Sequence, residues 1–333
     1  MKKYNINPII DNIRKTVERH KLADGSYCRW LWINGWADRT IEENPYGCAD
    51  AANILYTIGD FPRDLQEREA FVRNLQNMQA EDGMFHEETH ITEHTTAHCI
   101  AALELFDAGP KRPCTALLPC KDTLKLRKIL EDNARNGKSR GHFGAGIYVI
   151  MNLTGEADLE WNQAYFDWFN QYADEKTGYW YTQEDGGFKT GSALYCMGES
   201  FHYLFNYEAA RMPFPYPEKL IDSCIKLYDT PGQLPEDFGK CARFFEMDWI
   251  YCLTRASRQT PYRFWEIRER LEAFWEVYYE YLTTVDWETE DSINDLHYLF
   301  GLVCALAELQ QTLRGQLISD KPLKLVLDRR PFI

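Results

Sequence analysis

The sequence predicts an all-α protein built from six consecutive helical hairpins. The first observation behind this prediction is a residue pair, with leucine five positions after its first member, that recurs in six apolar segments. The first members are Asp50, His98, Tyr148, Glu199, Asp248 and Gly301, at steps of 48, 50, 51, 49 and 53 residues. Self-similarity at a near-constant period indicates an internal structural repeat.

The second observation is that each apolar segment has the same surroundings. A helical pattern with a charged face precedes it, and a polar or glycine-rich loop separates the two. The loop signals are Asp24-Gly25, Asp82-Gly83, Asn136-Gly137, Gly186-Gly187 and Pro231-Gly232, with Asp291-Ser292 in the last repeat. Such dipeptides favour turns, so each repeat is predicted to be one hairpin of two helices.

Taken in order, the chain alternates between two kinds of predicted helix. The charged-face helices are expected at residues 9–22, 65–80, 124–136, 159–174, 217–228 and 262–282. The more apolar helices are expected at residues 48–58, 93–105, 141–153, 192–206, 238–254 and 293–313. We predict a linker without helix at residues 110–119, and a tail at 315–333 with a short strand at 323–327. No composition shift divides the chain, so residues 1–333 are expected to form a single domain.

Alternating apolar and charged helices indicate an inner and an outer layer. The first and last pairs are as apolar as the middle ones, which favours a closed ring over a stack with polar caps. With this pattern the chain resembles the (α/α)6 toroid superfamily. The segment QNMQAEDGMFHEETHITEHTTAHCIAALELF resembles a repeat of the terpenoid cyclases and prenyltransferases, and GYWYTQEDGGFKTGSALYCMG resembles one of the unsaturated glucuronyl hydrolases. These resemblances imply an (α/α)6 toroid with inner and outer helix rings.

Composition indicates which binding partners and which cellular compartment to expect. The net charge of −14 argues against binding to nucleic acid or to an anionic membrane. The sequence contains no apolar run near the roughly 20 residues that a membrane span requires. The ten cysteines are scattered without a CxxC pair, and the N-terminus lacks an apolar signal region. We therefore expect a cytoplasmic protein with reduced thiols.

Equivalent positions of parallel inner helices would form rings around a central axis. The first ring would contain Asp50, His98, Tyr148, Glu199, Asp248 and Gly301. A second ring, four residues earlier and therefore on the same helix faces, would contain Tyr46, His94, Gly144, Tyr195, Phe244 and His297. Unpaired buried carboxylates are costly, so three acids in one ring indicate a functional site.

Paired acids and abundant aromatic residues are typical of glycoside hydrolases, in which one acid protonates the leaving oxygen and one base activates water. We therefore predict a carbohydrate-active enzyme, with Glu199 or Asp248 as the acid and Asp50 as the base. The substrate is expected to be a small carbohydrate. Its expected binding residues are His94, His98, Tyr148, Tyr195 and His297, with Trp36 and Trp180 stacking on the sugar at the mouth.

Three alternatives remain open. A uronate lyase or sugar epimerase would use His98 beside Tyr148, and a non-catalytic toroid would have its ring blocked by side chains. A zinc enzyme of prenyltransferase type would use the run His86, His90, His94 and His98, whose first part matches the HExxH pattern. However, the Asp-rich motifs of terpene cyclases are absent, and the prenyltransferase zinc ligands cannot be assembled. We therefore expect no cofactor and no metal.

Overall fold

The computed structural model describes residues 2–136, 139–180 and 192–333. Helices form almost all of the regular structure in these residues, which confirms the all-α class. The described strands are β1 (Tyr4–Asn5) and β2 (Leu317–Ile318), which pair in parallel with Tyr4 opposite Leu317. The turn signals at Gly137 and Gly186-Gly187 lie outside the described residues.

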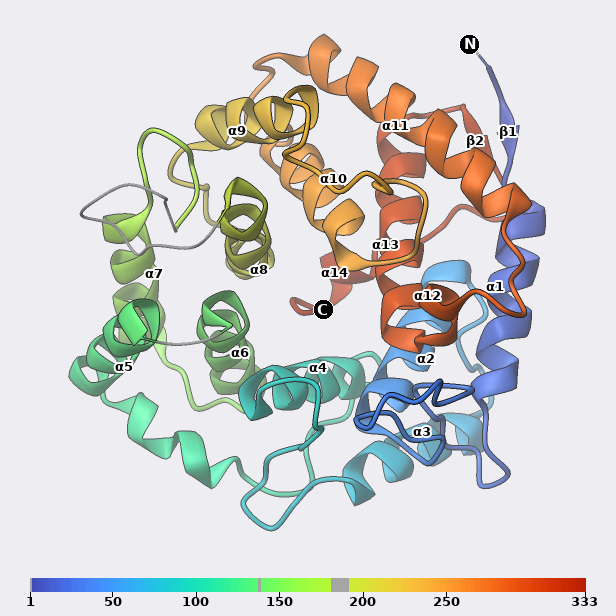
Figure 1. Cartoon of the computed structure of the whole chain (residues 1–333). Helices are drawn as coiled ribbons and strands as arrows, with labels where there is room; N and C mark the ends of the chain where they lie inside the picture. The colour runs from blue at the N-terminus through green and yellow to red at the C-terminus, as the bar shows by residue number, and fades with distance from the viewer. Residues whose placement is uncertain (1, 137–138, 181–191) are drawn as a thin grey trace.

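Six helices line the middle of the molecule and correspond to the apolar segments of the repeat. They are α2 (Pro45–Ile58), α4 (Thr92–Glu104), α6 (Arg140–Leu153), α8 (Ala193–Ala210), α10 (Phe244–Ala256) and α13 (Leu296–Thr312). Each packs against the next in this order, and α13 packs against α2, so the contacts among these helices form a closed circuit (Figure 1). Nearly every residue of α13 from Leu296 to Leu309 is buried, as expected for a helix that is apolar on all sides.

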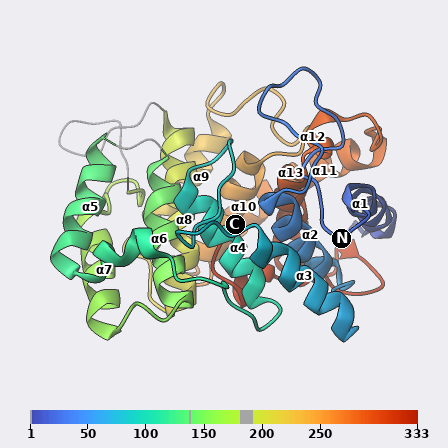
Figure 2. The same cartoon turned by 90° about the horizontal axis from the view of Figure 1, so that it is seen from below.

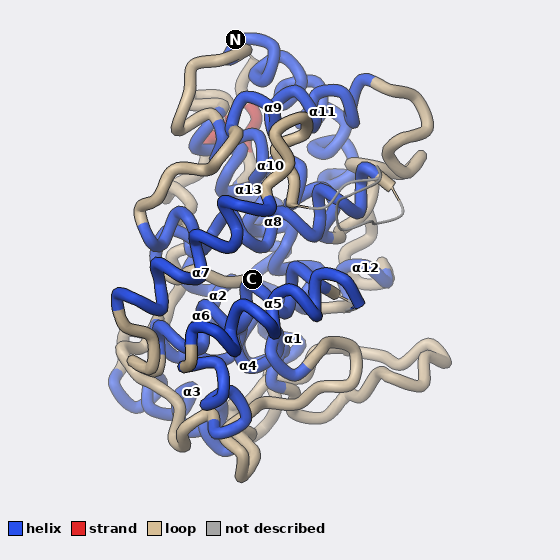
Figure 3. The backbone as a smooth tube through the Cα atoms, turned by 90° about the vertical axis from the view of Figure 1, so that its left-hand side faces the viewer, coloured by secondary structure: helices blue, strands red, loops and turns tan. Residues whose placement is uncertain are grey.

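The charged-face helices lie outside this circuit. They are α1 (Asn7–His20), α3 (Leu65–Asn77), α5 (Thr123–Asn136), α7 (Leu159–Tyr172), α9 (Pro217–Asp229) and α11 (Phe264–Thr284). In α5, the buried residues Leu126, Leu130 and Ala134 follow a four-residue spacing that forms one inward stripe. Figure 1 shows these helices around the outside, and Figures 2 and 3 show the same arrangement from two further sides.

Local capping explains where several helices begin. The Asn44 side chain accepts hydrogen bonds from the backbone N–H groups of Tyr46 (2.8 Å) and Gly47 (3.2 Å), with Pro45 in the first turn of α2. Asp64 and Asp158 cap α3 and α7 in the same way. These caps satisfy amide groups that have no partner within the helix.

Several predicted boundaries are wrong. The 110–119 linker leads into a 3₁₀ helix, η1 (Thr115–Lys121), and the strand expected at 323–327 is replaced by the short helix α14 (Val326–Arg329). The last apolar segment is divided into α12 (Asp291–Asn294) and α13, because Asp295 adopts an extended backbone and its carboxylate caps α13 at the His297 amide, 2.9 Å away. Similarly, α10 begins at Phe244, after the extended residue Arg243, rather than at 238.

The tail enters the middle of the molecule. After β2, α14 packs against α2 and α8, and the C label lies at the centre of Figure 1. Phe332 and Ile333 are buried, and the Phe332 ring centroid lies 4.8 Å from that of His94 and 5.4 Å from that of Phe205. The tail therefore fills part of the space that the inner helices surround.

In the described parts of the chain, every helix is too short or too polar to cross a membrane. The ten cysteines are free thiols, and all except Cys241 are buried.

Candidate functional site

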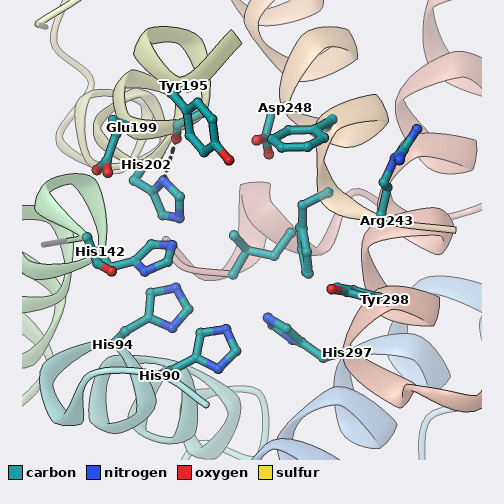
Figure 4. A pocket seen from close by; sticks show the side chains of 15 residues that line it. His90, His94, His142, Tyr195, Glu199, His202, Arg243, Asp248, His297 and Tyr298 are labelled. Carbon is teal, nitrogen blue, oxygen red and sulfur yellow. Dashed lines mark hydrogen bonds between the residues drawn. The ribbon is translucent and has the colours of Figure 1, made fainter. Parts of the chain in front are cut away.

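A cavity of about 360 Å³ lies at the N-terminal ends of the inner helices (Figure 4). Its lining residues are His90, His94, Ser139, His142, Tyr195, Gly198, Glu199, His202, Arg243, Phe244, Phe245, Asp248, His297, Tyr298 and Ile333. The volume is near the lower end of the roughly 300–1,000 Å³ that is typical of small-molecule sites.

Two carboxyl groups line the cavity from neighbouring helices. Glu199 on α8 accepts a hydrogen bond from the Gly141 amide at the start of α6, and burial raises its pKa. Asp248 on α10 is 4% exposed, and its Oδ1 has no hydrogen-bond partner among the described residues. Burial raises the pKa of Asp248 well above its usual value, and the charges of Glu246 and Glu199 raise it further. Of the two, Glu199 is therefore the easier to ionise.

Two glycines allow these carboxyl groups to sit where they do. A Cβ atom at Gly198 would lie 3.2 Å from Asp248 Oδ2, and one at Gly141 would collide with the backbone carbonyl of Glu199. The absence of side chains at these positions lets α8 approach both α10 and α6. Substitution of either glycine would therefore displace the acid beside it.

Three histidines from consecutive inner helices form the part of the wall that adjoins Glu199. His94 comes from α4, His142 from α6 and His202 from α8, and Figure 4 shows them side by side. The ring centroid of His142 lies 4.2 Å from that of His94 and 4.3 Å from that of His202. One potential ligand atom from each residue lies within 4.8 Å of those of the other two. We call this set the open histidine cluster.

Each of two rings in the open histidine cluster has one nitrogen engaged outside it. His202 Nδ1 lies 2.7 Å from the Gly198 carbonyl oxygen, and His94 Nδ1 contacts the Tyr46 hydroxyl. His94 Nε2 is buried and has no hydrogen-bond partner among the described residues. Burial lowers the pKa of His202 to about 4 and those of His94 and His142 well below the usual range. All three rings are therefore neutral near pH 7.

A second cluster lies behind the cavity and is held together by hydrogen bonds. Asp50 Oδ1 lies 2.7 Å from His98 Nε2, and the Asp50 carboxylate lies 3.1 and 3.2 Å from His297 Nδ1. Asp50 and His98 are fully buried, whereas His297 also lines the cavity. We call this set the closed cluster. Its three residues also have ligand atoms within 4.8 Å of one another.

A buried arginine connects the closed cluster to the loop before α4. Arg29 donates to both carboxylate oxygens of Asp295, at 2.8 and 2.9 Å, and to Glu87 and Thr89 at 3.3 and 2.7 Å. His90 Nδ1 lies 2.7 Å from Thr89 Oγ1. This network fixes the loop that brings His90 to the cavity and the cap that positions His297.

The structure separates the sequence-predicted site residues into three groups. Those that line the cavity are His94, Tyr195, Glu199, Asp248 and His297, and those behind it are Asp50 and His98. Tyr148, Trp36 and Trp180 do not belong to the lining. Tyr148 packs against Trp161, Tyr165 and Phe166 of α7, because this position of α6 faces the outer layer.

The two tryptophans also differ from their predicted place at the mouth. Trp180 is buried, and its indole N–H donates to the Phe169 carbonyl oxygen at 2.8 Å, so its ring is part of the core. Trp36 is 57% exposed in the loop before α2, next to Arg39. The His98–Tyr148 pair required by the lyase hypothesis is not formed, since His98 binds Asp50 and Tyr148 faces α7.

Sequence reasoning missed His142 and His202. His202 lies three residues after Glu199 on α8, a spacing that places both on one helix face, so the signal was present. His142 lies in the first turn of α6, outside the two predicted rings. The four-residue histidine run does not form one helix face: α4 begins at Thr92, so the HExxH segment is a loop, and His86 is exposed.

The chain matches no family model, no curated protein and no solved structure in the comparisons. Inference about its function therefore depends on the cavity.

Proposed function

We propose that the chain is an (α/α)6 toroid and a carbohydrate-active enzyme, specifically a glycoside hydrolase. The observation that carries this proposal is that Glu199 and Asp248, on adjacent inner helices, line one cavity and differ in how readily they ionise. Pairs of titratable groups with separated proton affinities supply the acid and the base of hydrolytic reactions. The closed circuit of helices supports the toroid. The C-terminal residues Phe332 and Ile333 fill part of the middle, but a cavity of about 360 Å³ remains at the N-terminal ends of the inner helices.

The roles follow from the two environments. Asp248, which holds its proton more tightly, would donate that proton to the leaving glycosidic oxygen. Glu199, whose carboxylate is stabilised by the Gly141 amide, would accept a proton from the attacking water. Asp50 was the predicted base, but its carboxylate is hydrogen-bonded to two histidines behind the cavity, so this role passes to Glu199.

The rest of the wall has groups suited to a sugar. Tyr195, Phe244, Phe245 and Tyr298 provide aromatic surface and hydroxyls, and Tyr195 is 59% exposed. Neutral imidazoles can donate to or accept from hydroxyl groups. The cavity volume of about 360 Å³ suits a small saccharide unit rather than a long chain enclosed on all sides. The free thiols support a cytoplasmic location.

The test is hydrolysis of a panel of chromogenic glycosides and short oligosaccharides, followed by reducing-sugar release. We expect turnover of one sugar class. Asp248→Asn and Glu199→Gln should each lower kcat by about 10²–10⁴-fold, the usual contribution of a general acid or base. Asp167→Asn, which changes a half-exposed carboxylate on the outer helix α7, is the matched control and should keep wild-type activity.

Two outcomes would contradict the proposal. One is that no member of the panel is hydrolysed or raises the melting temperature of the protein. The other is that both site variants retain wild-type kcat on a substrate that the wild type hydrolyses.

A further inference from the structure

The open histidine cluster carries an inference that is independent of the carbohydrate proposal. Its three rings come from three different helices and converge at one point of the cavity wall, yet no hydrogen bond joins them among the described residues. His94 is 1% exposed, and its Nε2 has no partner there. Buried polar atoms normally have partners, so an unpartnered nitrogen in a set of three imidazoles whose potential ligand atoms lie within 4.8 Å of one another indicates a missing ligand.

We propose that His94, His142 and His202 bind a zinc ion, with a fourth coordination position open to the cavity. Three neutral imidazoles are a typical protein ligand set for catalytic zinc, in which water or substrate takes the fourth position. Nitrogen ligands also suit copper, nickel and cobalt, but we assign zinc because three imidazoles with one open position are a ligand set typical of catalytic zinc.

The distances are compatible with this coordination. Tetrahedral zinc with bonds of about 2.0–2.1 Å requires nitrogen atoms about 3.3 Å apart. The potential ligand atoms of the cluster lie within 4.8 Å of one another, so each pair needs to approach by about 1.5 Å at most. The imidazole rings would have to move toward one another by that amount when the metal binds.

The outer contacts already orient two of the rings as zinc ligands. His202 Nδ1–H can donate to the Gly198 carbonyl oxygen, which leaves the Nε2 lone pair free. His94 Nδ1–H can donate to the Tyr46 hydroxyl with the same result, and Phe332 packs against the His94 ring. Metal-ligating histidines almost always donate their second nitrogen to such a partner, which fixes the tautomer.

The closed cluster is a poorer zinc site despite its similar composition. Both carboxylate oxygens of Asp50 already contact His297 Nδ1, and Oδ1 also contacts His98 Nε2. A metal there would have to replace these hydrogen bonds in a fully buried space. By contrast, the open cluster faces the cavity, so zinc can enter, and a water bound to it would face the wall that Asp248 and Glu199 line.

The experiment is a zinc titration of the full chain after removal of metals with a chelator. Affinity is measured by competition with a chromogenic zinc chelator, and stoichiometry by elemental analysis after gel filtration. We expect one zinc per chain. His142→Ala and His202→Ala should weaken binding by more than the roughly 10–100-fold that loss of an outer-shell partner causes, and Tyr46→Phe by about 10–100-fold.

His86→Ala is the matched control, because His86 is an exposed histidine of the loop before α4 and should not affect zinc affinity. His142→Ala is the primary variant, since the His142 side chain has no hydrogen bond among the described contacts and is partly exposed. Circular dichroism and thermal melting verify that each variant is folded. Cobalt substitution adds a spectroscopic measurement, with visible absorption of tetrahedral intensity that His142→Ala removes.

The proposal is overturned if the wild type binds no zinc, or if folded His142→Ala and His202→Ala bind zinc as tightly as the wild type. It is also overturned if His98→Ala abolishes binding while these two variants do not. Since zinc binding is measured without substrate, a failure of the glycosidase proposal would leave this result unaffected, and the reverse also holds.

Discussion

Two clusters of three residues lie close together in this molecule and differ in whether their members are hydrogen-bonded to one another. In the closed cluster, the Asp50 carboxylate contacts one nitrogen of His98 and one of His297 at 2.7–3.2 Å, while His98 Nδ1 is buried without a hydrogen-bond partner among the described residues. In the open histidine cluster, no hydrogen bond joins the three imidazoles to one another among the described residues, although His94 Nδ1 and His202 Nδ1 have partners outside the cluster. All three residues of the closed cluster are buried, whereas His142 of the open histidine cluster is partly exposed. The second difference is that hydrogen bonds join the members of the closed cluster to one another, whereas none joins the members of the open histidine cluster among the described residues.

The comparison indicates that the two clusters have different roles. A buried set whose members are hydrogen-bonded to one another fixes the helices that contribute to it, whereas a set without such bonds can bind a ligand without first breaking them. We infer that the closed cluster stabilises the packing of α2, α4 and α13, and that the open histidine cluster binds a ligand. Each substitution below alters one side of this comparison.

The largest expected effect on stability is at the closed cluster. Asp50→Ala removes the partner of two buried histidine nitrogens, and each unsatisfied group costs about 1–3 kcal/mol. We expect the free energy of unfolding to fall by about 2–6 kcal/mol in urea denaturation, with little change in zinc affinity. A loss below about 1 kcal/mol, or a loss of zinc binding in folded protein, would mean that the two clusters are not distinct.

Substitution of Asp248 is expected to change the free energy of unfolding less than Asp50→Ala does, and in the opposite direction. Asp248 lacks the histidine partners that Asp50 has. Its folded-state pKa is raised by burial, so the folded protein keeps a proton that the unfolded chain loses above a pKa of about 3.9. The contribution of Asp248 to stability is therefore greatest below that pH and falls as the pH rises toward the folded-state pKa.

Asp248→Asn should remove this dependence. The variant should gain stability relative to the wild type as the pH is raised from 4 to 7, which can be measured by urea denaturation at each pH. Glu131→Gln, which alters an exposed acid on α5, provides the control. A constant difference between variant and wild type across this range would show that Asp248 ionises normally in the folded protein.

The smallest effect on stability is expected within the open histidine cluster. The ring of His142 is partly exposed to the cavity, so His142→Ala should change the free energy of unfolding of the metal-free protein by about 1 kcal/mol or less. With zinc present, only the wild type should gain stability. A larger loss in metal-free protein would indicate that His142 is a structural residue like Asp50.

Much of the helical layout was predictable from the sequence, because apolar segments recur with leucine at one spacing and alternate with segments that have a charged face. The positions of Glu199, Asp248 and His297 at the cavity followed from the same repeat. Tyr148 did not, because a leucine five residues away does not fix how α6 rotates about its own axis. A four-residue step already advances the helix by about 40° beyond a full turn.

The open histidine cluster was harder to predict, because it depends on how closely three helices approach. A Cβ atom at Gly146 would lie 2.9 Å from the Glu93 carbonyl oxygen, so α6 lies directly against the start of α4. That approach brings His142 close to His94, although the two residues are 48 positions apart and belong to different repeats. In the predicted ring of equivalent positions, the residue of α6 beside His94 was Gly144 instead.

The most direct test of the difference between the two clusters is anomalous diffraction at the zinc edge from crystals of the full chain grown with zinc. We predict one strong peak about 2.0–2.1 Å from nitrogen atoms of His94, His142 and His202. No peak is expected between Asp50, His98 and His297. A peak in the closed cluster, or none at the open one in crystals at saturating zinc, would contradict the assignment of the open histidine cluster as the ligand-binding set.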